Sequence, residues 1–258
     1  MSKILVSGCS YTDDYWTAPN TNSRPAFDKT RRITGFPVWS DLFDADVTNL
    51  GKSGLGNDYI LNSIVDRIAI EKFDYVIAMW TEFLRIDLEF DDDEYNYEQL
   101  PWIAVNGRGD SPPDPQSWLP PNDFSGTLIY RKPFNYELFV KRALRTFYIF
   151  QQVMENIGIP YLQVVGCRCM PPALNYDVSR IISDSPIVDK INPDHFLGWP
   201  IFPDIGGWCI DDKLDEIDPS RAELRIGGGD NHPNKKGHEH IFDIITKENK
   251  NEIWKSVG

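Results

Sequence analysis

Close to its start the chain reads Lys3-Ile4-Leu5-Val6-Ser7-Gly8-Cys9-Ser10, and this stretch guides the interpretation of everything that follows. The aliphatic, partly β-branched run predicts a short buried strand over residues 4–7, and the glycine after it predicts a tight turn. The turn places the hydroxyl of Ser10 at the carboxyl end of the strand. In open α/β sheets the active site gathers at this end of the strands.

Strand and helix signals alternate along the rest of the chain, which favours a parallel sheet covered by helices on both faces. Further strands are expected at residues 47–50, 74–80 and 161–165. Amphipathic helices are expected at residues 35–43, at 57–68 with Asn57 or Asp58 as the cap, at about 135–156, and from about Asn234 onward. Right-handed crossovers between these strands predict an α/β fold, a three-layer α/β/α sandwich with a flavodoxin-like parallel sheet.

Two long stretches, residues 87–133 and 170–230, interrupt this alternation and are interpreted as loop insertions in a single domain spanning residues 1–258. The first begins with seven carboxylates between Asp87 and Glu98, and the second is rich in proline and glycine. Loops this long in a compact domain are usually lids or binding loops, or else poorly ordered. Consecutive carboxylates lack the alternating spacing of a calcium loop, so a solvated acidic loop is expected and no metal site.

The overall charge and the cysteines limit the classes of partner and compartment. With 26 Lys and Arg against 39 Asp and Glu, the net charge is −13. This negative field repels phosphates and anionic lipids, so neither nucleic acid nor membrane is expected as a partner. No signal peptide or transmembrane stretch is recognised, which predicts a cytoplasmic protein. The four cysteines, without a Cys-x-x-Cys pair, are expected to be free thiols.

The far end of the sequence supplies a complement to Ser10 in the run Asp230-Asn231-His232-Pro233-Asn234. A serine is a weak nucleophile until a base accepts its proton. His232 is the best-placed histidine, and Asp230 is expected to hold its tautomer, as in a Ser-His-Asp triad. The alternative is purely structural, with Ser10 capping a helix and residues 232–234 forming a loop and N-cap. A second Asp-His pair ending at His195 lacks a following helix start.

Three short blocks of the sequence resemble those of the SGNH, or GDSL-like, hydrolase superfamily. Gly8-Cys9-Ser10 is similar to the block that carries the nucleophile, and Asn49-Leu50-Gly51-Lys52-Ser53-Gly54 is similar to the second block. The run from Asp230 to His238 resembles the last block. The variant Gly-Cys-Ser-Tyr-Thr is most similar to divergent versions from tailed-phage genomes, which would place the protein in a host cytoplasm or a virion.

The resemblance implies an SGNH-type fold without a cofactor, with Ser10 as nucleophile, His232 as base and Asp230 as its orienting partner. It further implies that the Ser10 and Gly54 backbone N–H groups form an oxyanion hole together with a side chain from a third block.

The third block departs from the family pattern, since the family asparagine is replaced within Met79-Trp80-Thr81-Glu82-Phe83-Leu84-Arg85. We expect Thr81 at the asparagine position, where its hydroxyl donates one hydrogen bond. A carboxylate from Glu82 at that position would oppose the oxyanion. In the alternative interpretation, Glu82 pairs with Arg85, and the pair serves either a structural role or as a gate to the pocket.

The function predicted from these features is that of a serine-dependent ester hydrolase acting through an acyl-enzyme. The expected substrate is a small-molecule or carbohydrate ester that carries an acetyl or similar short acyl group. Tryptophans of the two insertions would either bind sugar rings or pack the loops onto the core: Trp102, Trp118, Trp199 and Trp208. Two alternatives remain open: an inactive SGNH-like binding or virion-associated protein, and an acyltransferase that uses the same Ser-His pair. The sequence gives no oligomeric state.

Overall fold

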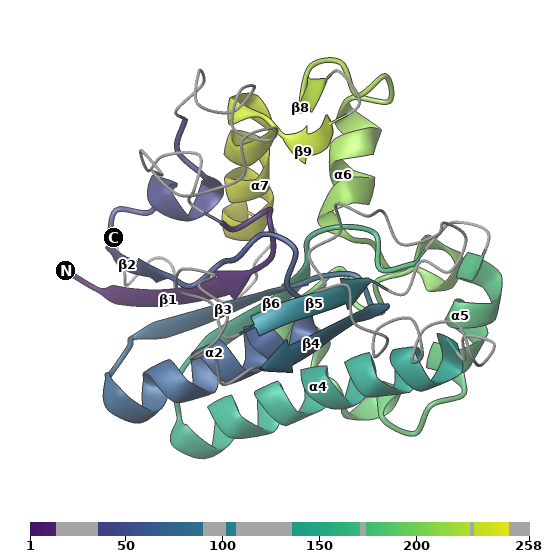
Figure 1. The fold of residues 1–258 in the computed structure, drawn as a ribbon, viewed down its shortest axis with the longest axis horizontal. Coiled ribbons are helices and arrows are strands. Elements are labelled where there is room, and N and C mark those ends of the chain that lie inside the picture. The colour runs from purple at the N-terminus through teal and green to yellow at the C-terminus, as the bar shows by residue number, and fades with distance from the viewer. Residues whose placement is uncertain (14–35, 90–101, 107–135, 171–173, 228–229, 248–258) are drawn as a thin grey trace, which may run out of the picture.

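The protein is represented by a computed structural model that describes residues 1–13, 36–89, 102–106, 136–170, 174–227 and 230–247. Its centre is a five-stranded parallel sheet in the order β2-β1-β3-β6-β7 (Figure 1). The strands are β1 (Lys3–Gly8), β2 (Asp46–Asn49), β3 (Tyr75–Trp80), β6 (Tyr161–Val165) and β7 (Phe196–Leu197). In this flavodoxin-like order, β2 lies on one side of β1, and the later strands are added on the other side, beginning with β3.

Helices cover both faces of the sheet, which confirms the predicted three-layer α/β/α sandwich (Figure 1). One face packs against α2 (Asn57–Ile70), α4 (Tyr136–Ile157) and α5 (Asn175–Ser183). The other face packs against the 3-10 helix η2 (Trp39–Leu42), α6 (Ile210–Ile217) and α7 (Lys235–Lys247). Because both faces are covered, β3 is buried at all six positions, as its unbroken apolar run predicts.

Two local predictions about helices are wrong. The helix expected at residues 35–43 is only the single 3-10 turn η2, because Asp41 accepts a hydrogen bond from the Val38 N–H and Phe43 is already extended. Helix α2 is capped neither by Asn57 nor by Asp58: Gly56 occupies its N-cap position without a side-chain bond. The carboxylate that caps α2 comes from another element and is described with the site.

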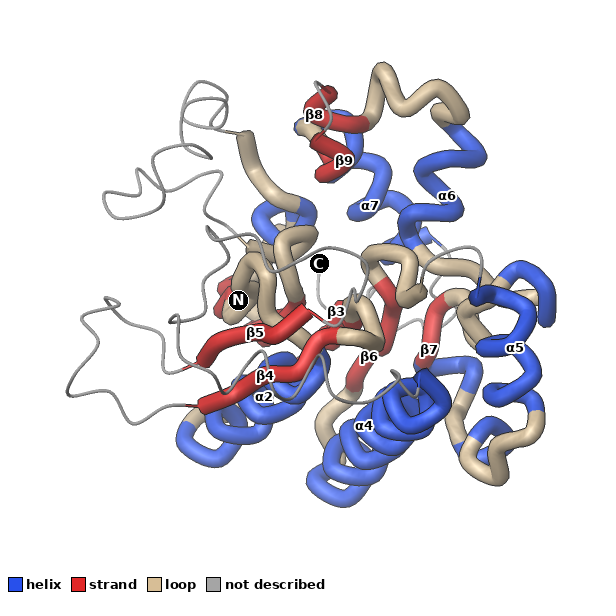
Figure 2. The backbone as a smooth tube through the Cα atoms, turned by 45° about the vertical axis from the view of Figure 1, so that its right-hand side comes forward, coloured by secondary structure: helices blue, strands red, loops and turns tan. Residues whose placement is uncertain are grey.

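The two stretches expected to be insertions differ in content. In the first, β4 (Arg85–Glu89) and β5 (Trp102–Asn106) form an antiparallel pair beside the main sheet (Figure 2). Most of the acidic run and Trp118 lie outside the described residues. The second contains α5, β7, α6, the first strand of a hairpin and three short 3-10 helices: η4 (Val188–Lys190), η5 (Pro193–His195) and η6 (Pro203–Ile205). Proline and glycine there mark turns between short elements, so this stretch completes the sheet.

The last strands form a separate antiparallel hairpin of β8 (Arg225–Gly227) and β9 (Asp230–Pro233), which leads into α7 (Figure 1). None of the described helices has the length and apolar composition required to cross a bilayer.

Candidate active site

Ser10 lies in the turn directly after β1, at the carboxyl edge of the sheet. The turn is closed by hydrogen bonds from the Thr12 and Asp13 N–H groups to the Cys9 carbonyl oxygen, at 2.9 and 3.0 Å. Ser10 is mostly buried, with 7% of its surface exposed. The strand and its short turn therefore fix the hydroxyl at the edge where the sequence places the active site.

His232 reaches this turn from β9, and its Nε2 lies 2.8 Å from the Ser10 Oγ. Its other ring nitrogen, Nδ1, lies 2.6 Å from Asp230 Oδ1. The same carboxylate oxygen accepts a hydrogen bond from the His232 backbone N–H at 2.9 Å. Ser10, His232 and Asp230 thus form one continuous chain of hydrogen bonds. The spacing of two residues between Asp230 and His232 is compatible with this chain because the carboxylate folds back onto its own strand.

The segment after β2 lies against the Ser10 turn. The Lys52 N–H donates to the Gly8 carbonyl oxygen at 2.9 Å, and the Ser53 N–H donates to the Asp13 carboxylate at 2.7 Å. A Cβ atom on Gly51 would lie 2.6 Å from the Thr12 carbonyl carbon, so only glycine fits this approach. Gly54 has φ +87°, in the region that favours glycine.

Two residues of β4 hold the other end of this segment. Asp87 accepts hydrogen bonds from the Gly56 and Tyr59 N–H groups at 2.7 and 2.8 Å, which makes it the cap of α2. The Arg85 guanidinium donates to the Leu55 carbonyl oxygen at 3.0 Å. Gly54 therefore lies in a segment that is fixed on both sides.

In the third block, the side chains of Thr81 and Glu82 both contact other residues of the protein. Thr81 is fully buried, and its Oγ1 lies 3.3 Å from the Cys167 Sγ. Its backbone N–H donates to the Asn57 side chain at 2.8 Å. Glu82 forms an ion pair with Arg85 at 3.4 Å, with about one seventh of each side chain exposed. The hydroxyl of Thr81 is thus directed to a thiol, and the charge of Glu82 is matched by Arg85.

Two thiols that are far apart in the sequence, those of Cys9 and Cys167, lie close together beside Ser10. Cys9 and Cys167 share a hydrogen bond, which lowers the pKa of Cys9 and raises that of Cys167. Arg85 adds to the first effect by its positive charge. All four cysteines are free thiols, as expected. No local signal pairs Cys9 with Cys167, because they follow different strands.

His195 lies away from this arrangement. Its ring stacks on Tyr161 with centroids 4.7 Å apart, and its Nδ1 lies 3.2 Å from the Tyr161 carbonyl oxygen. His238 is fully buried in α7. Among the histidines in the described part of the chain, His232 is the one that forms a hydrogen bond with Ser10.

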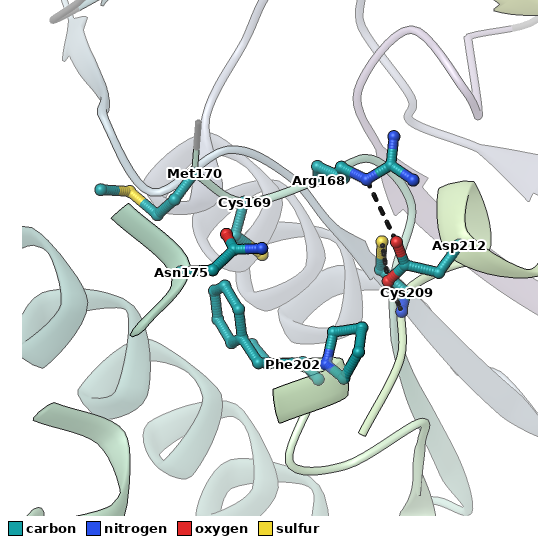
Figure 3. A pocket seen from close by; sticks show the side chains of 9 residues that line it. Arg168, Cys169, Met170, Asn175, Phe202, Cys209 and Asp212 are labelled. Carbon is teal, nitrogen blue, oxygen red and sulfur yellow. Dashed lines mark hydrogen bonds and ion pairs between the residues drawn. The ribbon is translucent and has the colours of Figure 1, made fainter. Parts of the chain in front are cut away.

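A pocket of about 270 Å³, open to solvent, lies beside the segment that follows β6 (Figure 3). Arg168 and Asp212 lie at one side, and Phe202 and Met170 lie across from them. None of the predicted site residues lines it. In the described part of the chain, no three side chains are grouped so that they would hold a metal ion.

Comparisons with known proteins find similarity in structure only: no protein-family profile and no curated protein matches this chain. A lipolytic protein of the G-D-S-L family from Desulfitobacterium hafniense DCB-2 is 13% identical over 96% of this chain and 99% of its own, with a TM-score of 0.49. An acetylxylan esterase from Geobacillus stearothermophilus is 13% identical over 98% of this chain and 95% of its own, with a TM-score of 0.43. A lipase/acylhydrolase from Enterococcus faecalis is 14% identical over 96% and 95%, with a TM-score of 0.41.

Proposed function

We propose that this protein is a serine ester hydrolase of the SGNH type, with Ser10 as nucleophile, His232 as general base and Asp230 as the residue that orients His232. The observation that carries this proposal is the chain of hydrogen bonds from Ser10 Oγ through both His232 nitrogens to Asp230. Such a chain is the geometry by which a base activates a hydroxyl.

The reaction would proceed in two steps. Ser10 Oγ attacks the ester carbonyl carbon while its proton passes to His232 Nε2, and Asp230 stabilises the imidazolium that forms. The alcohol leaves with the proton from His232, and the acyl group stays on Ser10. A water molecule, deprotonated by His232, then releases the acid and restores the serine.

The negative oxygen of the intermediate would be stabilised by the Ser10 and Gly54 backbone N–H groups. Neither group donates a hydrogen bond to another described residue. Preorganised donors of this kind are worth roughly 2.7–4 kcal/mol each in the barrier. The contacts on both sides of Gly54 support this role, because they fix the position of its N–H group before substrate binds.

A second candidate function, ligand binding without turnover, is favoured by the third block. Thr81 Oγ1 interacts with Cys167 Sγ, and the neighbouring Glu82 carries a carboxylate. A site with two oxyanion donors in place of three stabilises the intermediate less well. We place the hydrolase first because Arg85 offsets the charge of Glu82. For the substrate we propose an ester of a short acyl group, such as acetyl, on a small molecule or a carbohydrate.

The proposal is tested by hydrolysis of a short-chain aryl ester such as 4-nitrophenyl acetate. We expect turnover by the unchanged protein and at least a thousandfold loss of kcat in both Ser10→Ala and His232→Ala. His195→Ala is the matched control and should keep the original rate. Retained activity in His232→Ala, or loss in His195→Ala, would show that another base acts. A folded wild-type protein without any turnover would favour the binding function.

A further inference from the structure

We infer that Asp211 is a positioning residue that fixes Ser10 and His232 relative to one another through Tyr11 and Arg225. The inference deepens the proposed hydrolase function and rests on it. Tyr11 follows Ser10 in the turn after β1, Asp211 lies in the first turn of α6, and Arg225 begins β8. The three side chains thus belong to three separate elements around the site.

Tyr11 connects the Ser10 turn to α6. Its hydroxyl donates to Asp211 Oδ1 at 2.6 Å, and only 4% of the residue is exposed. Its ring meets the His232 ring edge-on, with centroids 5.9 Å apart. Burial and the nearby Asp211 charge raise the pKa of Tyr11 well above its usual value, so the hydroxyl stays protonated and acts as a donor. A single side chain therefore contacts both the base and the helix.

Arg225 connects the same carboxylate oxygen to the hairpin that carries His232. Its Nη2 lies 2.7 Å from Asp211 Oδ1, and its side chain is 2% exposed. In the hairpin Arg225 pairs with Pro233, the residue directly after His232. Asn234 adds a bond from its side-chain amide to the Arg225 carbonyl oxygen at 2.9 Å. Displacement of Arg225 would therefore move the strand that bears the base.

Asp211 is itself anchored to the sheet, which makes it a fixed point for both neighbours. Its Oδ2 accepts from the Arg168 N–H, and its own N–H donates to the Gly166 carbonyl oxygen, both at 3.1 Å. Gly166 directly follows β6. Hydrogen bonds to a charged acceptor are stronger than neutral ones. The carboxylate thus ties the Ser10 turn, the His232 hairpin and the end of β6 together.

This arrangement matters for catalysis because rates depend steeply on the distance between reacting groups. A misplacement of about 1 Å can cost on the order of 100-fold in rate. Ser10 and His232 come from elements that share no sheet, since β1 lies in the central sheet and β9 in the separate hairpin. The hydrogen bonds of Tyr11 and Arg225 to Asp211 connect these two elements by noncovalent contacts.

The test is Tyr11→Phe, which removes the bond to Asp211 and keeps the ring against His232. We expect kcat for the aryl ester to fall about tenfold with KM unchanged, at a temperature where the variant is fully folded. Glu216→Gln removes a carboxylate from the exposed face of the same helix and should change neither constant. Unchanged kcat in Tyr11→Phe, or a rise in KM alone, would overturn the inference.

A double-variant cycle adds a second criterion. Asp211→Ala should lose at least as much kcat as Tyr11→Phe, and adding Tyr11→Phe to it should cost less than a further twofold, because both changes remove the same link. Fully additive losses would contradict the inference. If Asp211→Ala does not fold, the Tyr11→Phe measurement decides alone.

Failure of the proposed function would be recognised separately, as a wild-type protein without turnover. In that case hydrogen exchange decides the inference. Amides of β9 should exchange several-fold faster in Tyr11→Phe than in the wild type or in Glu216→Gln. Equal exchange in all three proteins would overturn it.

Discussion

At the scale of the residue, the site depends on side chains that are distant in sequence and recognisable only in part. Ser10 and His232 are separated by 222 positions, yet each lies in a short block with its own signal: a strand and tight turn for one, an Asp-x-His-Pro run for the other. No such signal connects Tyr11 with Asp211, because neither residue type by itself indicates a contact with a distant part of the chain. Tyr11 and Asp211 come into contact because β1 and β6 pair with opposite sides of β3 and α6 packs over this part of the sheet.

Asp230→Asn tests the orienting role proposed for Asp230. An asparagine preserves the shape of the side chain but cannot hold the imidazole with the same tautomer and charge, so kcat should fall by about 10²–10⁴-fold. Steady-state hydrolysis of the aryl ester measures this. Asp194→Asn, next to His195, is the control and should retain the wild-type kcat. A loss of less than threefold in Asp230→Asn would show that Asp230 does not orient the base.

At the scale of the element, the strands were the most predictable part and the helix caps the least. The strands expected at residues 47–50, 74–80 and 161–165 coincide with β2, β3 and β6 to within one residue. The sequence favours a cap from the first residues of α2 itself, because cap signals are recognised from neighbouring residues. The actual cap, Asp87, is supplied by β4, and no local pattern announces a partner 28 or more residues away.

Asp87→Ala tests whether β4 holds the segment that carries Gly54. The change removes two hydrogen bonds at the start of α2, so the free energy of unfolding should fall by roughly 1–2 kcal/mol. Urea unfolding at pH 7 measures this. Asp66→Ala, on the exposed side of α2, is the control and should lie within about 0.5 kcal/mol of the wild type. Equal stability of the two variants would show that the cap contributes nothing. Loss of kcat in the folded Asp87→Ala protein would additionally support Gly54 as a donor.

At the scale of the whole molecule, the alternation of strands and helices suffices to predict the three layers and a parallel sheet. The content of residues 170–230 was less predictable, because β7 has only two residues and the helices are short. These elements contain too few apolar residues to show a helix or strand periodicity in the sequence. The contacts of the third block could not be predicted either, since the Thr81 hydroxyl lies against Cys167, which follows a different strand.

The packing of α7 against η2 predicts how stability depends on pH. His238 is fully buried, and burial, with a smaller effect from His232, lowers its pKa to about 3. Its Nδ1 accepts a hydrogen bond from the Trp39 N–H. Between pH 3 and about 6.5 the unfolded chain therefore binds a proton that the folded protein does not, so stability falls as the pH falls through this window.

His238→Asn keeps an acceptor for Trp39 and removes the titration. On lowering the pH from 6.5 to 5, the wild type should lose roughly 1.5 kcal/mol more free energy of unfolding than the variant. Urea unfolding of both proteins at the two pH values measures the difference. Parallel losses in the two proteins would contradict the assignment of His238 as a neutral buried histidine.

Whether Ser10 is an activated nucleophile can be measured with a fluorophosphonate probe, followed by mass spectrometry of the labelled peptide. We expect one adduct, on Ser10, that forms in the wild-type protein, fails to form in folded His232→Ala and forms normally in His195→Ala. Folded wild-type protein that remains unlabelled at Ser10, or Ser10 labelling that does not depend on His232, would contradict it.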